Sequence, residues 1–189
     1  MIYVFLATGF EDIEALAPVD IMRRAGLEVV TVSITGEKAV ESAHGVKVVA
    51  DAMLADAELD KAEMLVLPGG MPGSVHLDEC EPLRQALVRH HAEGKPLAAI
   101  CAAPMVLGHL GLLDGVKATC YPGVESQLGD AIYTAELVCN DGQFITGRGP
   151  AAAMEFGYAI VERLLGCQGA SALREGMIYN QLIQEAKNK

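Results

Sequence analysis

The stretch that decides the fold is KPLAAICAAPMVLGHL, Lys95 to Leu110. Pro96 to Ile100 is a short apolar run typical of a strand buried on both faces, and Ala102 to Leu110 favours a helix that ends at Gly111. Cys101 lies between the two, so the chain must turn sharply there. Such a turn presents Cys101 at the carboxyl edge of a sheet, facing the first free N–H groups of the helix.

Two interpretations of Cys101 follow from this position. The positive end of a helix favours thiolate over thiol, which lowers the pKa of a cysteine held there and makes it a candidate nucleophile. Alternatively, Cys101 is a small buried apolar residue, because free cysteine is among the most frequently buried residue types. The Ala102–Ala103 pair that follows suits plain packing equally well.

Length and composition indicate one soluble globular domain over residues 1–189, with 51% hydrophobic and 21% charged residues. The N-terminal apolar run MIYVFLA is too short to cross a membrane and lacks a basic start, so we expect a first strand and a cytoplasmic protein. Five cysteines in an odd, scattered set suggest neither disulfides nor zinc. The net charge of −11, without a basic cluster, argues against nucleic acid and anionic membranes as partners.

Strands and helices alternate along the chain, with glycine-rich turns after the strands. The apolar runs predict strands over 2–7, 27–34, 64–67 and 96–100, and helices over 13–25, 81–93, 102–110, 151–165 and 171–186. The last helix is either continuous or divided at Gly176. Hairpins are expected within 37–50 and, around Asp141-Gly142, between 137–140 and 143–146. The pattern predicts an α/β, flavodoxin-like doubly wound sandwich: a mostly parallel sheet with helices on both faces and a cysteine at the elbow.

In such sheets ligands bind outside the carboxyl ends of the strands. The loops 8–12 and 68–73 lie at that edge together with Cys101. Glu14, in the first turn of the first helix, could aim its carboxyl at this edge and exchange protons there, or be an ordinary solvated acid. The N–H groups of the Gly69-Gly70 turn and of Ala102 could hold an oxyanion, unless the glycines form a plain turn.

Several other kinds of site are not indicated. The chain lacks the GxGxxG, GxxxxGK[ST] and GxSxG patterns, and no set of metal ligands emerges. Of the histidines, His90 and His91 are expected in solvent and His44 in a turn, while His109 lies too far along its helix. His76, after the glycine turn, is the one histidine with a plausible route to the pocket. Arg148 is expected either to pair with an acid such as Glu155 or to orient nearby loops.

Four ordered motifs together resemble the ThiJ/PfpI superfamily, and within it the branch of the parkinsonism-associated protein deglycase and its bacterial relatives. The motifs are GFEDIEALAPVDIMRRAG (9–26), LVLPGG (65–70), AAICAAP (98–104) and TGRGPAAAMEFGYAIVERL (146–164). The resemblance covers essentially the whole chain. It implies a flavodoxin-like homodimer whose reactive residue is Cys101, contacted by the acid Glu14 and by the N–H groups of Gly70 and Ala102.

The sequence departs from that branch at two positions. Tyr121 stands where the human member has a histidine before a proline. Tyr121 and Gly69 are expected to line the pocket. A neutral phenol cannot move protons near pH 7 as an imidazole does, so acid–base duty falls to Glu14. Ala102 stands where the peptidase members have a histidine, which argues against proteolysis.

The resemblance implies several activities. The leading hypothesis is a cofactor-free glyoxalase or deglycase-like enzyme, in which the Cys101 thiolate attacks a small-molecule carbonyl substrate and Glu14 moves the proton. The alternatives are a redox-sensing or chaperone-like stress protein with an oxidisable Cys101, and a hydrolase or hydratase that acts on another substrate.

Overall fold

The computed structural model, which describes residues 1–188, contains a central sheet whose middle strands are buried along their whole length. These strands are β1 (Ile2–Leu6), β6 (Met64–Leu67), β7 (Leu97–Ile100) and β11 (Phe144–Gly147). Strands covered on both faces need apolar residues at every position, which is why their sequences read as continuous apolar runs. The strands predicted over 2–7 and 96–100 are present as β1 and β7.

The sheet has seven strands in the order β10-β11-β7-β6-β1-β2-β5, and every pair is parallel except the β10–β11 hairpin. Two small two-stranded sheets, β3–β4 and β8–β9, lie beside it. The remaining strands are β2 (Val29–Ser33), β3 (Ala39–Glu41), β4 (Lys47–Val49), β5 (Ala52–Met53), β8 (Lys117–Ala118), β9 (Ile132–Tyr133) and β10 (Val138–Asp141). Both predicted hairpins are confirmed.

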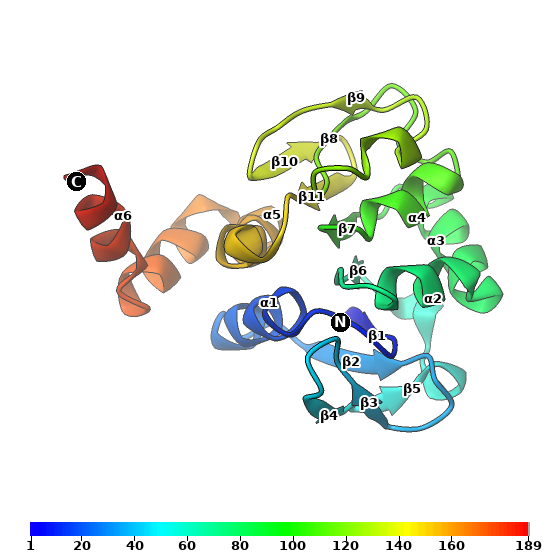
Figure 1. Cartoon of the computed structure of the whole chain (residues 1–189). Helices are drawn as coiled ribbons and strands as arrows, with labels where there is room; N and C mark the ends of the chain where they lie inside the picture. The colour runs from blue at the N-terminus through cyan, green and yellow to red at the C-terminus, as the bar shows by residue number, and fades with distance from the viewer. Residues whose placement is uncertain (189) are drawn as a thin grey trace.

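Helices cover both faces of the sheet (Figure 1). The α-helices are α1 (Asp12–Arg24), α2 (Gly73–Glu79), α3 (Glu81–Ala92), α4 (Pro104–His109), α5 (Ala153–Gly176) and α6 (Tyr179–Lys187). Short 3₁₀ turns occupy Leu54–Asp56, Leu59–Lys61, Glu125–Gln127 and Pro150–Ala152. The short helix α2 was not predicted, because seven residues give too few turns for a clear period.

Alternate strand residues point to two separate apolar layers. Ile2 and Val4 face the core formed with α1 and α5, whereas Tyr3 and Phe5 face the core formed with α2, α3 and α4. Figure 1 shows α1 and α5 on one side of the sheet and the other three helices on the opposite side. The predicted doubly wound architecture is confirmed.

The strand order reverses next to β1, which has β2 on one side and β6 on the other. The loops that follow β1, β6 and β7 therefore meet at one edge of the sheet, as ligand-binding loops do in this class of fold. Two backbone hydrogen bonds join the first two loops: the Glu11 N–H donates to the Gly69 carbonyl (2.9 Å) and the Gly73 N–H to the Gly9 carbonyl (3.2 Å). This is the edge that the sequence predicts for the site.

The C-terminal segment is helical, as expected for 171–186, and it is divided after Gly176, the alternative that the sequence also offered. Helix α5 breaks at Gly166 (φ +78°), resumes to Gly176 and is followed by α6, so the segment projects from the body of the protein (Figure 1). Its attachment is local: Tyr179 packs on Tyr158 with ring centroids 4.9 Å apart, and Arg174 lies over the Tyr158 ring. Gly166, the glycine expected to end the helix that begins near Ala151, has non-helical φ and ψ and separates two helical segments.

Large apolar side chains are exposed on two neighbouring segments, α1 and the β3–β4 hairpin. They are Ile13, Leu16, Val46 and Val49. A homodimer, as implied by the resemblance, would cover surface of this kind; it stays a prediction. Within residues 1–188, none of the helices combines the length and the apolar character needed to cross a membrane.

Candidate active site

Cys101 occupies a strained turn directly after β7. Its φ of +65° is in the left-handed region, which few non-glycine residues adopt and which persists only where the surroundings enforce it. Two backbone hydrogen bonds do so: the Cys101 N–H donates to the Gly147 carbonyl, and the Tyr121 N–H donates to the Cys101 carbonyl, both at 2.8 Å. The sharp strand-to-helix turn expected at Cys101 is present, and it leaves the side chain partly exposed at the sheet edge.

Glu14 is fully buried. From the sequence alone, a solvated acid near the start of the helix was the simpler expectation. Neither of its carboxyl oxygens has a well-formed hydrogen bond to another group in the described part of the protein. The groups that act on the carboxyl are the Cys101 side chain and the Gly69 N–H. A buried carboxyl with so few partners is costly in its charged form, so it retains a proton to higher pH.

Burial raises the pKa of Glu14 to about 7, and the neighbouring Glu11 charge adds to the shift. The contacts with Cys101 and with the Gly69 N–H act in the opposite direction but are outweighed. Near neutral pH the carboxyl is therefore protonated in part of the molecules. A group that holds and releases a proton near the working pH is suited to acid–base catalysis.

The two glycines after β6 bring backbone against both side chains. A Cβ atom on Gly69 would lie 2.4 Å from Glu14 Oε2 and 2.5 Å from Cys101 Cβ, so only glycine fits there. Gly70 has a φ of +98°, which also favours glycine. This turn is thus an integral wall of the site, and the plain-turn interpretation does not account for its closeness to both groups.

The pKa of the Cys101 thiol is raised, which is the opposite of the shift expected from the helix end alone. Burial is the largest cause, and the charge of Glu14 adds to it; the N–H groups of Ala102 and Gly70 favour the thiolate but do not outweigh the other effects. Since each group disfavours a second negative charge, Cys101 and Glu14 titrate as a pair. Protonation of Glu14 removes the repulsion and supplies a hydrogen-bond donor to the sulfur.

A cavity of about 580 Å³ opens above this pair. It is lined by Glu11, Ala43, His44, Gly70, Met71, Cys101, Ala102, Met105, Tyr121, Val124, Gln127 and Pro150. Tyr121, predicted as a pocket residue, is 48% exposed at this wall. The cavity is open enough for a small organic molecule to reach the sulfur.

The histidines are arranged differently from the expectation. His44, expected only in a turn, lines the Cys101 cavity, whereas His76 lies in a separate cavity of about 330 Å³, where Nδ1 is 2.8 Å from the Thr8 carbonyl oxygen. His90 is buried and not solvated, with Nε2 3.1 Å from the Pro96 carbonyl oxygen, and burial lowers its pKa. The sequence carries no signal for where the β3–β4 turn packs, so the position of His44 at the Cys101 cavity was not predicted.

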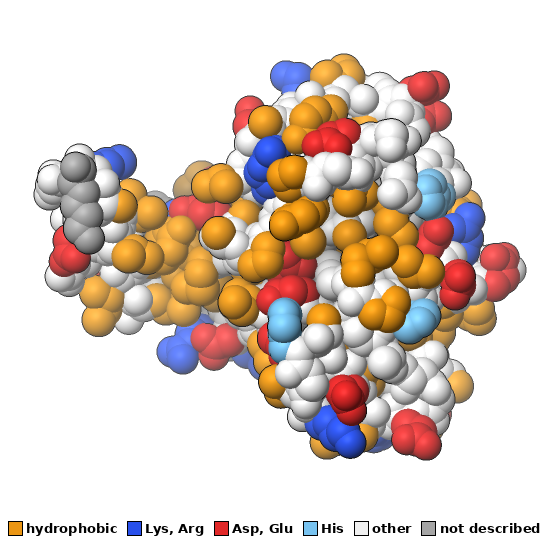
Figure 2. Space-filling model, viewed as in Figure 1, with side chains coloured by type: hydrophobic (Ala, Val, Ile, Leu, Met, Phe, Trp, Pro, Cys, Tyr) orange, Lys and Arg blue, Asp and Glu red, His pale blue; other side chains and the backbone are white. Residues whose placement is uncertain are grey.

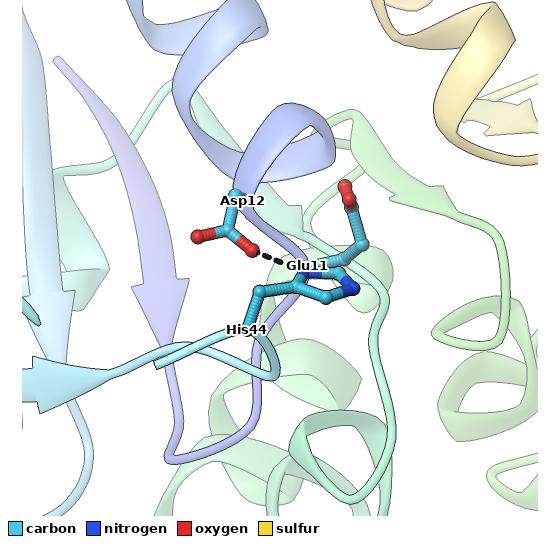
Figure 3. A group of neighbouring side chains, drawn as sticks. All are labelled: Glu11, Asp12 and His44. Atoms are coloured by element: carbon cyan, nitrogen blue, oxygen red, sulfur yellow. Dashed lines mark hydrogen bonds and ion pairs between the residues drawn. The ribbon is translucent and has the colours of Figure 1, made fainter. Parts of the chain in front are cut away.

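Glu11, Asp12 and His44 form the one group within residues 1–188 whose donor atoms, all within 4.8 Å of one another, could hold a metal ion (Figure 3). Sequence reasoning did not predict such a set. Glu11 accepts the Glu14 N–H at 2.7 Å and caps α1, and Asp12 Oδ2 lies 2.6 Å from His44 Nδ1. A metal ion would compete with both hydrogen bonds.

Arg148 does not pair with Glu155, which was one of the two roles expected for it. Its guanidinium donates to the Tyr133 hydroxyl at 2.8 Å, whereas Glu155 pairs with Arg174 at 2.6 Å. The pairing of Arg148 with Glu155 is therefore wrong. Arg174 and Glu155 both belong to α5, on either side of the bend at Gly166, and the bend brings them together.

The chain is similar to a known protein family and to several of its members. Residues 1–163 match the model of the DJ-1/PfpI family. The chain is 40% identical to Protein DJ-1 homolog B of Arabidopsis thaliana over 87% of its own length but only 38% of the relative, so it spans less than half of that protein. It is 36% identical to Protein dj-1beta of Drosophila melanogaster, covering 94% of this chain and 97% of that one.

Two further relatives bear on the chemistry of the site. Glutathione-independent glyoxalase DJR-1.2 of Caenorhabditis elegans is 32% identical, with 86% of this chain and 87% of the relative covered. The solved structure of Toxoplasma gondii DJ-1 in oxidised form superposes with a TM-score of 0.90 at 35% identity, covering 94% of this chain and 97% of that chain.

The raised pKa of Glu14 predicts a change in how stability depends on pH. Because the folded state binds this proton more tightly than the unfolded state, wild-type stability falls as pH rises from about 4.5 to about 7. Glu14→Gln removes this loss, so the variant should gain up to about 3 kcal/mol relative to wild type across that range, at about 1.4 kcal/mol per pKa unit.

Urea denaturation at several pH values measures this difference. Glu28→Gln, at an exposed glutamate, is the matched control and should show no such trend. A stability difference between Glu14→Gln and wild type that stays constant with pH would contradict the assignment.

Proposed function

The chain belongs to the DJ-1/PfpI family, and from that premise we propose that it is an enzyme that attacks small reactive carbonyl compounds with the Cys101 sulfur. The observation that carries the proposal is the fully buried Glu14 carboxyl, short of hydrogen bonds, next to that sulfur. The Caenorhabditis elegans relative, named a glutathione-independent glyoxalase, supports this class of reaction. The sulfur and the carboxyl supply both the nucleophile and the acid–base group, so the proposed reaction requires no cofactor.

The first step adds the Cys101 thiolate to the aldehyde carbon of a 2-oxoaldehyde such as methylglyoxal. A carbon–sulfur bond forms and the carbonyl electron pair moves to oxygen, giving a hemithioacetal oxyanion. The N–H groups of Gly70 and Ala102, which already face the sulfur, are suited to stabilise this oxyanion. Protonated Glu14 would stabilise the attacking thiolate before the bond forms and would then transfer its proton to the oxyanion, so that the hemithioacetal is neutral and Glu14 is left as the carboxylate.

The second step moves a proton between adjacent carbons. Glu14, as carboxylate, takes the proton from the hemithioacetal carbon and returns it to the neighbouring carbon, so the former aldehyde carbon is oxidised and the former ketone carbon is reduced. The product is a thioester of a 2-hydroxy acid. Water then cleaves the carbon–sulfur bond, releases the acid and restores the Cys101 thiol.

Tyr121 is the other side chain that could take part in this proton transfer. It lines the cavity, and its phenol is not a proton shuttle of the imidazole type. The carboxyl of Glu14, with its pKa near 7, is therefore assigned the transfer alone. Deglycase-like activity on early adducts of carbonyl compounds would begin at the same sulfur.

A second candidate function is the sensing of oxidants through Cys101. The relative from Toxoplasma gondii was solved in an oxidised form, and the Glu14 carboxyl of this chain could donate a hydrogen bond to an oxidised sulfur. The partial exposure of Cys101 allows a peroxide to reach it.

Removal of either reacting group should abolish turnover. We expect Cys101→Ser and Glu14→Gln each to lower methylglyoxal consumption by at least about a hundredfold, since each removes a group that acts on the reacting atoms. Lactate formation measured by a coupled assay provides the readout. Cys167→Ser, at an exposed cysteine outside the cavity, is the control and should keep full activity. Turnover that survives in either of the first two variants would refute the mechanism.

Mild peroxide treatment should add two oxygen atoms at Cys101 and leave the buried Cys120 unmodified, because access and contact with Glu14 favour the first site. Mass spectrometry of the digested protein locates the added oxygens. Oxidation that starts at Cys120, or that spares Cys101, would exclude the sensing function.

A further inference from the structure

Arg148 follows β11 at the same edge of the sheet as Cys101. The carbonyl of Gly147, one residue before Arg148, accepts the Cys101 N–H at 2.8 Å, so the fold fixes the backbone of Arg148 beside the reactive turn. Arg148 lines a cavity of about 190 Å³. Tyr121 and Pro150 line both this smaller cavity and the Cys101 cavity, so the two cavities share a wall.

The ring of Tyr121 is held in that shared wall. The Tyr121 N–H donates to the Cys101 carbonyl, and a Cβ atom on Gly149 would lie 3.2 Å from the Tyr121 ring. The ring therefore lies against the backbone of the residue that follows Arg148. The smaller cavity is in this way a lateral extension of the Cys101 cavity, with the tyrosine ring between them.

The guanidinium of Arg148 has one edge that is held and one that is free. Nη1 donates to the Tyr133 hydroxyl at 2.8 Å, which orients the group. Within residues 1–188, Nε and Nη2 have no hydrogen-bond partner, and no carboxylate oxygen lies within 4.0 Å of a nitrogen of this guanidinium. Nε and Nη2 form the edge through which an arginine holds both oxygens of a carboxylate. The free edge thus has the geometry of a carboxylate receptor.

The surroundings of the guanidinium add no competing charge within the cavity. Among the described residues that line it, Arg148 is the one charged side chain. The charge of Glu125 acts on the Cys120 thiol, as that of Arg148 does, but Glu125 accepts the Gly123 N–H at 2.7 Å and lines neither cavity. Figure 2 shows mainly apolar side chains, and few basic ones, on the part of this face where β8 and β9 lie in Figure 1. A single cation in an apolar setting favours an anion as its partner.

We propose that Arg148 binds a carboxylate of the substrate, so that the preferred substrates are 2-oxoaldehydes that carry a carboxylate a few bonds from the carbonyl groups. The reacting carbonyl lies in the Cys101 cavity and the carboxylate in the smaller cavity, with the connecting chain against the Tyr121 ring. The reaction class rests on the proposed function, whereas the binding of a carboxylate does not. Arg148 is thus a specificity-determining residue, and its charge is present at every working pH.

Alkylation of Cys101 by two matched reagents tests this recognition without any turnover. The reagents are N-bromoacetyl-β-alanine and its amide, which differ in the terminal carboxylate alone. In both, the thiolate forms a carbon–sulfur bond and bromide leaves, so the ratio of the two rates cancels the fraction of thiolate. Peptide mass spectrometry follows Cys101, and the exposed Cys167 serves as an internal reference. A chelator in the buffer keeps metal ions from Glu11, Asp12 and His44.

The expected acid-to-amide ratio at Cys101 is about tenfold higher in wild type than in Arg148→Gln, in line with one charge-assisted, bidentate contact. Arg148→Lys keeps the charge but lacks the planar edge, so its ratio should lie between the two. Arg89→Gln, at an exposed arginine on α3, changes the net charge equally and should leave the ratio unchanged. Cys167 should show none of these changes.

A ratio at Cys101 that is the same in wild type and Arg148→Gln overturns the proposal. An equal fall in Arg89→Gln also overturns it, since net charge alone would then explain the effect, and a full ratio in Arg148→Lys overturns bidentate binding. Thermal unfolding of each variant establishes that it is folded before its ratio is compared.

Turnover is measured separately with methylglyoxal and with 4,5-dioxopentanoate, a 2-oxoaldehyde that carries a carboxylate. The proposed reaction adds one water to the latter and gives 2-hydroxypentanedioate. Its kcat/KM relative to that of methylglyoxal should fall about tenfold in Arg148→Gln. A charge-dependent alkylation ratio without turnover of either compound refutes the proposed enzyme but keeps the carboxylate site, and turnover with a ratio that does not depend on Arg148 does the reverse.

Discussion

The contact between the buried Glu14 carboxyl and the Cys101 sulfur is the constraint on which the site depends. Neither group is stable there as an isolated charge, because burial raises the pKa of both. The ionisation of each group therefore depends on the protonation state of the other. The N–H groups of Gly70 and Ala102 favour the thiolate but do not outweigh burial.

The sheet topology supplies this contact from segments far apart in sequence. Glu14 follows β1, Gly69 follows β6 and Cys101 follows β7, and these strands are neighbours at the reversal of strand order. The backbone of Gly69 fits between the other two residues only because it lacks a side chain. The packing of α1 on α5 and on the sheet holds the first turn of α1 in place. The cost of burying one carboxyl is thus offset by apolar packing on both faces of the sheet.

Sequence reasoning located the elements that have strong local signals and missed those that depend on tertiary contacts. The buried strand before Cys101 and the hairpin at Asp141-Gly142 were predictable from apolar runs and turn chemistry. The burial of Glu14 was not, because a helix-terminal acid looks solvated until the neighbouring loops are known, and only the family resemblance singled it out. The positions of His44 and of the C-terminal segment in the fold were not predicted for the same reason: where a hairpin or a bent helix lies is set by partners distant in sequence.

The central claim is that the Glu14 carboxyl is buried beside Cys101 and keeps its proton up to near neutral pH. The most direct measurement is the titration of the Glu14 carboxyl by carbon-13 NMR in protein labelled at glutamate side chains, compared with Cys101→Ala. The account predicts a midpoint for Glu14 near 7 that moves when the sulfur is removed. A midpoint near the ordinary glutamate value of about 4.3, unaffected by Cys101→Ala, would contradict it.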